Sequence, residues 1–415
     1  MATPVVDVWV AFGKGFNESA AYPADFTKIS TANNVRQFRV KRGRGHQLDT
    51  IQAGTASLVL DNANGYLDPS NTGSGSPYYT GGATNVKPGR HVVIEATDPE
   101  TSTTYKIFRG FAESWEQKYG RDGVDQLVVL KAVDAFKVLA RALGDGGVEA
   151  ETTSRARVKN LWSQAGYPQA VVGWTDGKTV PARTYEESDN LLLAAQAVDK
   201  AEVGFFFVDR SGLFSFLTRE SRVTQFGTKE GTFSDDLTAD PTAFPYHAVD
   251  FSRDDDEVFN RGTATLYNSA TTATTQNDTT SQTDYGIRTY DEPELMLTSG
   301  SEATSWAAYA VDRFANPEDR ARVLTFYPQD YPALWAKILP MDLGELWVVK
   351  RRPKAGNTIT VNVLTEQIIH EGRPGIWRTE LALSSAVGGS YWVLDDGAGT
   401  YAASSTLGST TKLFY

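Results

Sequence analysis

Apolar and polar residues alternate with a period of two in two separate parts of the chain, and this alternation constrains the fold more than any other feature. Near the start, Thr55, Ser57 and Val59 alternate with Ala56, Leu58 and Leu60. Near the end, Trp377, Thr379, Leu381 and Leu383 alternate with Arg378, Glu380, Ala382 and Ser384. Successive side chains on a strand point to opposite faces, so this period predicts half-buried strands. Short strands separated by Gly, Pro and Asn predict a mainly β protein.

The middle of the chain, from about 150 to 250, has a different pattern. Apolar residues recur there at helical spacing in "SRARVKNLWSQAG" and "SDNLLLAAQAVDKAEVG", and each stretch ends at a glycine. In the second stretch Leu191, Ala194, Ala195, Val198 and Ala201 share one face, and Ser188 is the expected N-cap. Phe205–Val208 and Leu213–Leu217 flank a turn, which predicts a β-hairpin.

The change in pattern divides the chain into four regions. We expect a first β domain over 1–145, a lateral domain of helices and a hairpin over 146–250, a second β domain over 251–385 and a C-terminal arm over 386–415. Helices are predicted at Asp134–Gly144 and Ser301–Ala315. Asn268–Thr283 reads either as a flexible loop or as a threonine-rich exposed hairpin. The aromatic residues of the arm predict that it packs on a neighbour.

Composition narrows the classes of function. The chain has 415 residues and a formal charge of −11, which argues against a nucleic-acid binder with a broad basic face and favours protein partners. It has no cysteine, which excludes disulfides and thiolate metal sites. Met1–Val10 lacks a signal-peptide pattern, and no apolar run approaches the roughly 18 residues of a membrane span. We expect assembly in a reducing cytoplasm without membrane insertion.

Catalytic and cofactor motifs are absent from the sequence, which predicts no enzyme activity and no cofactor. The spacing of oxygen ligands after Asp61 does not fit a calcium loop, so Asp61–Tyr79 is interpreted as a structural turn. Asp254–Phe259, "DDDEVF", is interpreted as a solvated loop, because adjacent acids on an extended chain point to opposite faces. Glu113 and Glu116 are the candidate acid pair of a hydrolase, which requires two facing carboxylates.

One strand is strongly basic. Between Val35 and His46 it carries Arg36, Arg39, Lys41, Arg42 and Arg44. These side chains either form ion pairs within a sheet or line an interface or a passage for DNA. The acidic charge of the chain as a whole favours the first interpretation when the strand is taken alone.

The order of the segments carries a resemblance to a known family. "VKRGRGHQLDTIQAGTASLVLDNANGYLDPSNTGSGSPYY", "NVKPGRHVVIEAT" and "IFRGFAESW" resemble the opening of minor tail proteins of long-tailed, non-contractile phages, especially those of actinobacterial hosts. "AEVGFFFVDRSGLFSF", "NRGTATL", "YGIR", "GELWVVKRRP" and "IWRTELALSS" are similar to their middle and end. The resemblance covers most of the chain and rests on the ordered series rather than on any single motif.

The resemblance implies a baseplate hub: a homotrimeric ring at the virion tail tip that closes the tail tube and surrounds a DNA passage. Its implied partners are the distal tail protein, the tape-measure protein, other tail-tip or fibre proteins, and phage DNA in transit without sequence recognition. The alternatives are a hexameric distal tail protein, a host-carbohydrate-binding receptor module and a wall hydrolase. A trimer that caps sixfold rings needs an internal duplication. We therefore expect 1–145 and 251–385 to form two similar β-barrel-like ring domains, each paired with a helix.

Overall fold

The computed structural model describes residues 3–73, 75–121, 126–166, 171–173, 176–218, 229–269, 275–386, 391–392 and 412–413. It is mainly β, as predicted. The chain forms two compact units, and the first comprises 1–252 and 320–384, whereas the second comprises 253–319 and 385–415. The predicted boundaries at 251 and 385 lie close to breakpoints of this division, but the grouping differs: 320–384 belongs to the same unit as 1–252, and a separate unit is inserted within the second strand-rich region.

The first strand-rich region supplies six main strands to a 13-stranded sheet. They are β1 (Val5–Ala11), β3 (Val35–Gly43), β4 (Thr55–Asp61), β7 (His91–Thr97), β8 (Thr104–Tyr119) and β9 (Gln126–Val133). Their order in the sheet is β1-β7-β8-β9-β4-β3, and β2 (Thr27–Lys28) pairs with β1. β8 is long enough to pair with β7 through its first half and with β9 through its second. β5 (Tyr79–Thr80) and β6 (Ala83–Thr84) form a small ladder in the connection between β4 and β7.

The second strand-rich region supplies six more strands to the same sheet. They are β17 (Gly231–Ser234), β18 (Ala248–Ser252), β22 (Arg320–Phe326), β23 (Leu346–Arg351), β24 (Ile359–Arg373) and β25 (Ile376–Ser385). Their order is β17-β23-β24-β25-β22-β18. Short helical turns η2 (Pro328–Asp330), η3 (Pro332–Leu334) and α7 (Trp335–Ile338) connect β22 to β23.

The two regions have the same strand order. Numbered along the chain within each region, both sheets read first, fourth, fifth, sixth, third, second. This shared order agrees with the predicted internal repeat, and we call the regions the first and second repeat. They differ at one position, because β1 runs antiparallel to β7 whereas β17 runs parallel to β23.

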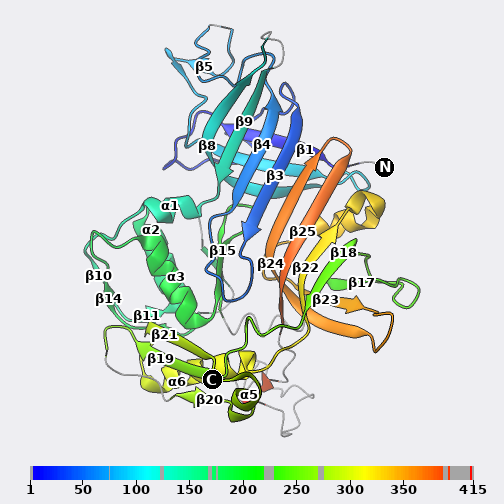
Figure 1. The fold of residues 1–415 in the computed structure, drawn as a ribbon. Helices are drawn as coiled ribbons and strands as arrows, with labels where there is room; N and C mark the ends of the chain where they lie inside the picture. The colour runs from blue at the N-terminus through cyan, green and yellow to red at the C-terminus, as the bar shows by residue number, and fades with distance from the viewer. Residues whose placement is uncertain are drawn as a thin grey trace, which may run out of the picture. The chain divides into compact units, whose positions relative to one another are not determined.

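The predicted matching of helices between the repeats is wrong. α1 (Phe136–Arg141) follows the last strand of the first repeat, whereas α6 (Gly300–Phe314) belongs to the inserted unit. The repeats also do not stand apart as two barrels. β3 pairs with β24, so both repeats form one continuous sheet, with β3 in blue beside β24 in orange in Figure 1.

One hydrophobic cluster extends across both repeats. Val40, Leu58, Leu130 and other inward residues of the first repeat lie in the same cluster as Trp335 and Trp377 of the second. The Trp377 ring lies 4.6 Å from that of Phe38, centroid to centroid. β3 and β4 bury alternate side chains in this cluster, so the alternation seen in the sequence there becomes one buried and one outer face.

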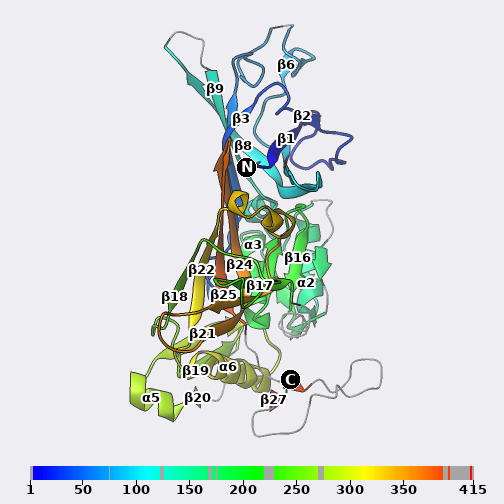
Figure 2. The same cartoon turned by 90° about the vertical axis from the view of Figure 1, so that its right-hand side faces the viewer.

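The lateral region, 134–230, packs helices against a hairpin. It contains β10 (Val148–Glu149), β11 (Thr152–Thr153), α2 (Ser154–Gln164), β12 (Val171–Gly173), β13 (Thr179–Val180), β14 (Arg183–Thr184), α3 (Leu191–Glu202), β15 (Phe205–Val208) and β16 (Phe214–Leu217). The hairpin of β15 and β16 is confirmed. The N-cap of α3 is Asn190 rather than Ser188, because the Asn190 carboxamide oxygen accepts from the N–H groups of Leu192 and Leu193. In Figure 2 α2 and α3 lie on the same side of β24 and β25 of the main sheet.

The inserted unit is a small α+β fold. β19 (Arg261–Leu266) lies between β20 (Gln276–Asn277) and β21 (Thr289–Leu295), and α5 (Thr279–Tyr285) and α6 complete the unit. Gly262 lets α6 approach β19, since a Cβ there would lie 2.6 Å from the Ala307 carbonyl oxygen. The predicted loop or hairpin at Asn268–Thr283 is replaced, in its described part, by β20 and the start of α5. The N-cap of α6 is Ser299.

The predicted C-terminal arm lies almost wholly outside the described residues. Within it, β26 (Tyr391–Trp392) pairs in parallel with β27 (Lys412–Leu413). No helix among the described residues is long and apolar enough to cross a membrane.

Candidate assembly surface

The junction between β3 and β24 is where the two repeats meet. The strands pair antiparallel from Phe38 opposite Gly372 to Gly43 opposite Gln367. Gly43 has a φ of +97°, and a Cβ there would lie 2.0 Å from the Glu366 carbonyl oxygen. A glycine is therefore required where β3 leaves the ladder. The junction is a close main-chain contact between segments more than 300 residues apart in sequence.

The five basic residues of this strand are separated by the pleat of the sheet. Arg36 pairs with Asp61 at 2.6 Å and Arg39 with Glu371 at 2.8 Å, and both arginine side chains are more than half exposed. Lys41 is also exposed. These three residues lie at the surface, where their predicted role at a passage or interface remains a prediction.

Arg42 and Arg44 lie in the interior, contrary to a role at a passage or interface. The Arg42 side chain is 2% exposed and its Nη1 lies 2.5 Å from the Asp342 carboxylate. Arg44 Nε lies 2.8 Å from the fully buried carboxylate of Glu366. The end of β3 crosses the junction and is covered by the second repeat, so these two residues form internal ion pairs. Their positive charge alone does not predict that they are buried while Arg39 is exposed.

Several carboxyl groups lie around Arg42, and no local sequence pattern predicts them. Asp342 also accepts from the backbone N–H of Arg210, in the turn of the lateral hairpin, at 3.1 Å. The Asp342 N–H donates to Glu345 at 3.0 Å. Burial raises the pKa of Glu345 to about 8, and the nearby charge of Asp342 acts in the same direction. This cluster connects β3, the lateral hairpin and the segment before β23.

Asp134 is a second buried carboxyl group near Arg42. It accepts from the N–H groups of Gly54 at 2.6 Å and Phe136 at 3.0 Å. Burial raises its pKa to about 7, although both backbone donors and Arg42 act against the shift. Its hydrogen bonds fix the start of α1 against the loop before β4, so its role is structural.

The outer face of the main sheet is the face away from the hydrophobic cluster. It carries charges of both signs in pairs: Lys131 with Glu116 at 2.5 Å, Arg378 with Glu371 at 2.8 Å, and Arg378 with Glu380. Glu371 accepts from both Arg39 and Arg378. The outer face therefore carries ion pairs of both signs as well as exposed basic residues such as Lys41.

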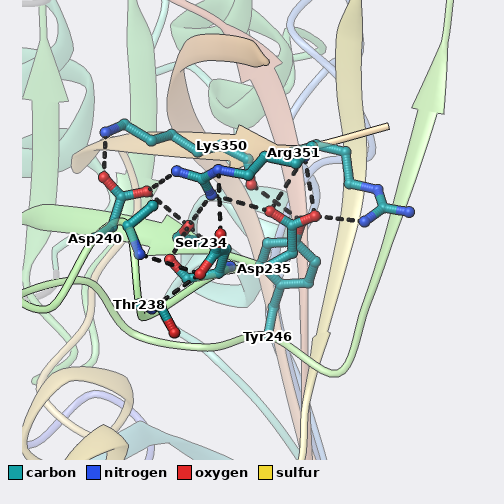
Figure 3. A network of polar contacts seen from close by, with 10 residues as sticks. Ser234, Asp235, Thr238, Asp240, Tyr246, Lys350 and Arg351 are labelled. Atoms are coloured by element: carbon teal, nitrogen blue, oxygen red, sulfur yellow. Dashed lines mark hydrogen bonds and ion pairs between the residues drawn. The ribbon is translucent and has the colours of Figure 1, made fainter. Parts of the chain in front are cut away.

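A second ionic network holds β17 to β23 (Figure 3). Asp240 accepts from Arg352 and Lys350, each at 2.6 Å, and these hydrogen bonds hold the pKa of its carboxyl group well below the usual range. Asp235 pairs with Arg351. Parallel pairing of β17 with β23 is thus reinforced by side chains at the ends of both strands.

Each glutamate of the candidate acid pair forms an ion pair with a lysine. Glu113 pairs with Lys137 and Glu116 with Lys131, each at 2.5 Å. The Lys131 ammonium lowers the pKa of Glu116, the opposite of what a general acid needs. Among the described residues no group of three or more His, Asp or Glu side chains could hold a metal ion.

The two other acidic segments are structural. In the loop after β4, Asn62 Oδ1 accepts from the Leu67 N–H and Asp68 Oδ1 from the Ser70 N–H, which confirms the turn expected at Asp61–Tyr79. In the inserted unit, Asp255 pairs with Arg288 at the surface, whereas Glu257 and Val258 of the same segment are buried, so the loop expected to be solvated is exposed only in part.

Comparison with known proteins was informative only at the level of structure. No protein-family model and no curated protein matches the chain. The tail protein from Neisseria meningitidis MC58 matches with a TM-score of 0.59 at 12% identity, over 93% of this chain and 98% of that chain. The 43 kDa tail protein of prophage MuSo2 from Shewanella oneidensis matches with a TM-score of 0.56 at 12% identity, over 92% and 97%. The prophage tail protein gp18 from Listeria monocytogenes EGD-e matches with a TM-score of 0.50 at 8% identity, over 91% and 94%. The chain thus has the fold of these phage tail proteins over nearly its whole length.

Proposed function

We propose that this protein is a structural component of a phage tail, and specifically a ring-forming hub at the tail tip. The observation that carries the proposal is the duplicated strand order of the two repeats. A trimer of such chains presents six nearly equivalent β surfaces and can therefore match a tube built from sixfold rings. The shared fold with prophage tail proteins supports the same assignment.

The outer face of the sheet suits a wall along which DNA passes. A strongly basic wall would hold the phosphate backbone and retard passage, because each neutralised phosphate adds affinity. Here Arg39, Lys131 and Arg378 are each matched by a carboxylate. DNA in transit would meet a surface of low net charge and no base-reading groups, so passage would not depend on sequence.

The hub's neighbours in this proposal are the distal tail protein above it, the tape-measure protein within it, and other tail-tip or fibre proteins around it. Assembly takes place in the host cytoplasm and the product is part of the virion. The role is non-enzymatic, consistent with the two lysine-bound glutamates.

The test is the rotational symmetry of the protein in the assembled tail tip, measured by electron microscopy with class averaging. A threefold ring with six similar lobes supports the hub. A sixfold ring built from six chains would support the distal tail protein instead of the hub. Six chains with two lobes each would make a twelve-lobed ring, which is not the six-lobed ring expected of a trimeric hub.

A second measurement tests the absence of activity. The purified chain should release no soluble fragments from host peptidoglycan. Sustained cleavage that Glu113→Gln or Glu116→Gln abolishes would identify a wall hydrolase instead.

A further inference from the structure

Two of the edge segments of the main sheet, β18 and the second half of β8, have a partner strand on one side only within the described chain. β18 pairs with β22 on one side, and its Ala248 and Asp250 are exposed. The second half of β8 pairs with β9 on one side, but β7 covers β8 only as far as Phe111. Tyr119, at the end of β8, is 60% exposed. Open edges of this kind can pair with another chain.

The repeat relates these two edges to the internal junction. β18 occupies in the second repeat the place of β3 in the first, and β8 occupies the place of β24. Within the chain β3 pairs with the second half of β24. The equivalent contact would join β18 to the second half of β8. A single chain does not form it, because six other strands of the sheet lie between β18 and β8.

We infer that β18 of one copy pairs antiparallel with Ser114–Tyr119 of β8 in a second copy, as β3 pairs with β24 within the chain. This inference rests on the proposed ring and names the surfaces that close it. Each copy would use one junction internally and contribute one edge to each neighbour. The ring would then be a continuous sheet with alternating internal and intermolecular junctions.

The register follows from two fixed points. β7 begins opposite Phe111 of β8 and β23 begins opposite Leu364 of β24, so these positions correspond. Lys41 lies opposite the first residue of β4 and Ser252 opposite the first residue of β22, so they also correspond.

Lys41 pairs with Ile369, whose counterpart in β8 is Glu116. Ser252 is therefore placed opposite Glu116 and Asp250 opposite Lys118. On the other face of the sheet, Val249 is placed opposite Tyr119, which is 60% exposed in the single chain. The apolar side chain would therefore cover an exposed aromatic ring.

Charge supports this register. Asp250 beside Lys118 repeats, with the signs exchanged, the ion pair of Arg39 with Glu371. A slip of two residues, which would keep the same faces together, would place Asp250 opposite Glu116 and bring two carboxylates together. Opposite charges across a ladder stabilise pairing and like charges oppose it.

Cysteine pairing tests the contact, because the chain has no cysteine of its own. The Arg44 backbone N–H donates to the Glu366 backbone carbonyl oxygen. Because hydrogen-bonded and non-hydrogen-bonded pairs alternate along the ladder, Arg39 and Glu371 form a non-hydrogen-bonded pair. The Cα atoms of such pairs are about 4.5 Å apart, close enough for a disulfide. Asp250→Cys combined with Lys118→Cys should give disulfide-linked trimers under mild oxidation, which reductant returns to single chains.

Two matched pairs serve as controls. Arg39→Cys with Glu371→Cys should form a disulfide within one chain and no linked oligomer. Asp250→Cys with Thr104→Cys should form neither, because β7 already pairs with that part of β8. Single chains alone from the Asp250/Lys118 variant, or equal linkage with Thr104, would overturn the inference.

A charge exchange gives an independent measurement. Asp250→Lys and Lys118→Asp should each weaken self-association, by up to about fivefold per junction, and the combined exchange should restore it. Glu187→Lys, at an exposed position of the lateral region, should have no effect. A threefold ring without the 250–118 linkage would overturn this pairing and leave the hub intact, whereas a tail tip without a threefold ring of this chain would overturn both.

Discussion

The first and second repeats place their strands in the same order but hold their ends by different means. In the first repeat the free side of β3 is filled by β24, with buried ion pairs at the end of the strand. In the second, the corresponding strand β18 has a bare edge, and the far strand β17 is held by an ionic network near the surface. The same strand order can therefore have this strand paired on both sides, as for β3, or on one side only, as for β18. The following predictions test how far the two repeats are equivalent.

The largest expected effect is at the internal junction. Arg44→Ala would leave the buried carboxylate of Glu366 without its cation and should lower the free energy of unfolding by about 3–5 kcal/mol. Arg39→Ala, five residues earlier on the same strand, removes an exposed pair and should cost less than about 1 kcal/mol. Urea unfolding of both variants measures the difference. Equal losses in the free energy of unfolding would show that the buried ion pair of Arg44 contributes no more to stability than the exposed pair of Arg39.

Core substitutions test whether the repeats unfold together. Leu58 in β4 and Leu324 in β22 are both fully buried. Truncation of either to alanine should cost about 2–5 kcal/mol, from lost apolar contact and the remaining cavity. Because one cluster and one sheet join the repeats, both variants should shift a single transition with an unchanged urea dependence.

Leu193→Ala is the control for that experiment, since Leu193 is 66% exposed. It should leave the transition where it is. Two separate transitions, with each core variant shifting only one of them, would contradict the continuity of the repeats.

The smallest predicted effect is a dependence on pH that belongs to the second repeat. Glu345 immediately precedes β23, and the equivalent position before β7 is Arg90. The pKa of Glu345 is about 8 in the folded protein against a usual value of 4.5, so the folded state keeps a proton that the unfolded state releases. Stability should therefore fall as pH rises between these values, by up to about 1.4 kcal/mol per pH unit.

Glu345→Gln should flatten that slope, measured as the free energy of unfolding at pH 5.5, 7 and 8.5. Asp134 contributes a slope of the same sign, so the informative quantity is the difference between wild type and variant. An identical slope in both would show that Glu345 titrates in the folded protein as it does in the unfolded chain.

The alternation of apolar and polar residues was sufficient to predict the strands and their buried faces. Ala56, Leu58 and Leu60 are buried as expected, and so is the predicted face of the helix that begins at Leu191. These are local properties, because the period of the side chains depends only on the backbone conformation of one element. The internal repeat was predictable for a different reason, namely the symmetry that the resemblance implied.

Tertiary structure alone decided the rest, because it brings together residues that lie far apart in the sequence. No local pattern separates Arg39, at the surface, from Arg42 and Arg44, whose partners lie about 300 residues away in the second repeat. The same holds for Glu345, whose pKa depends on its burial. The insertion of 253–319 between β18 and β22 was equally invisible, since a strand gives the same two-residue period whether or not the next strand in sequence is its neighbour in the sheet. The sequence by itself thus determined the elements and their faces, whereas long-range pairing decided which charges are buried and which edges stay open.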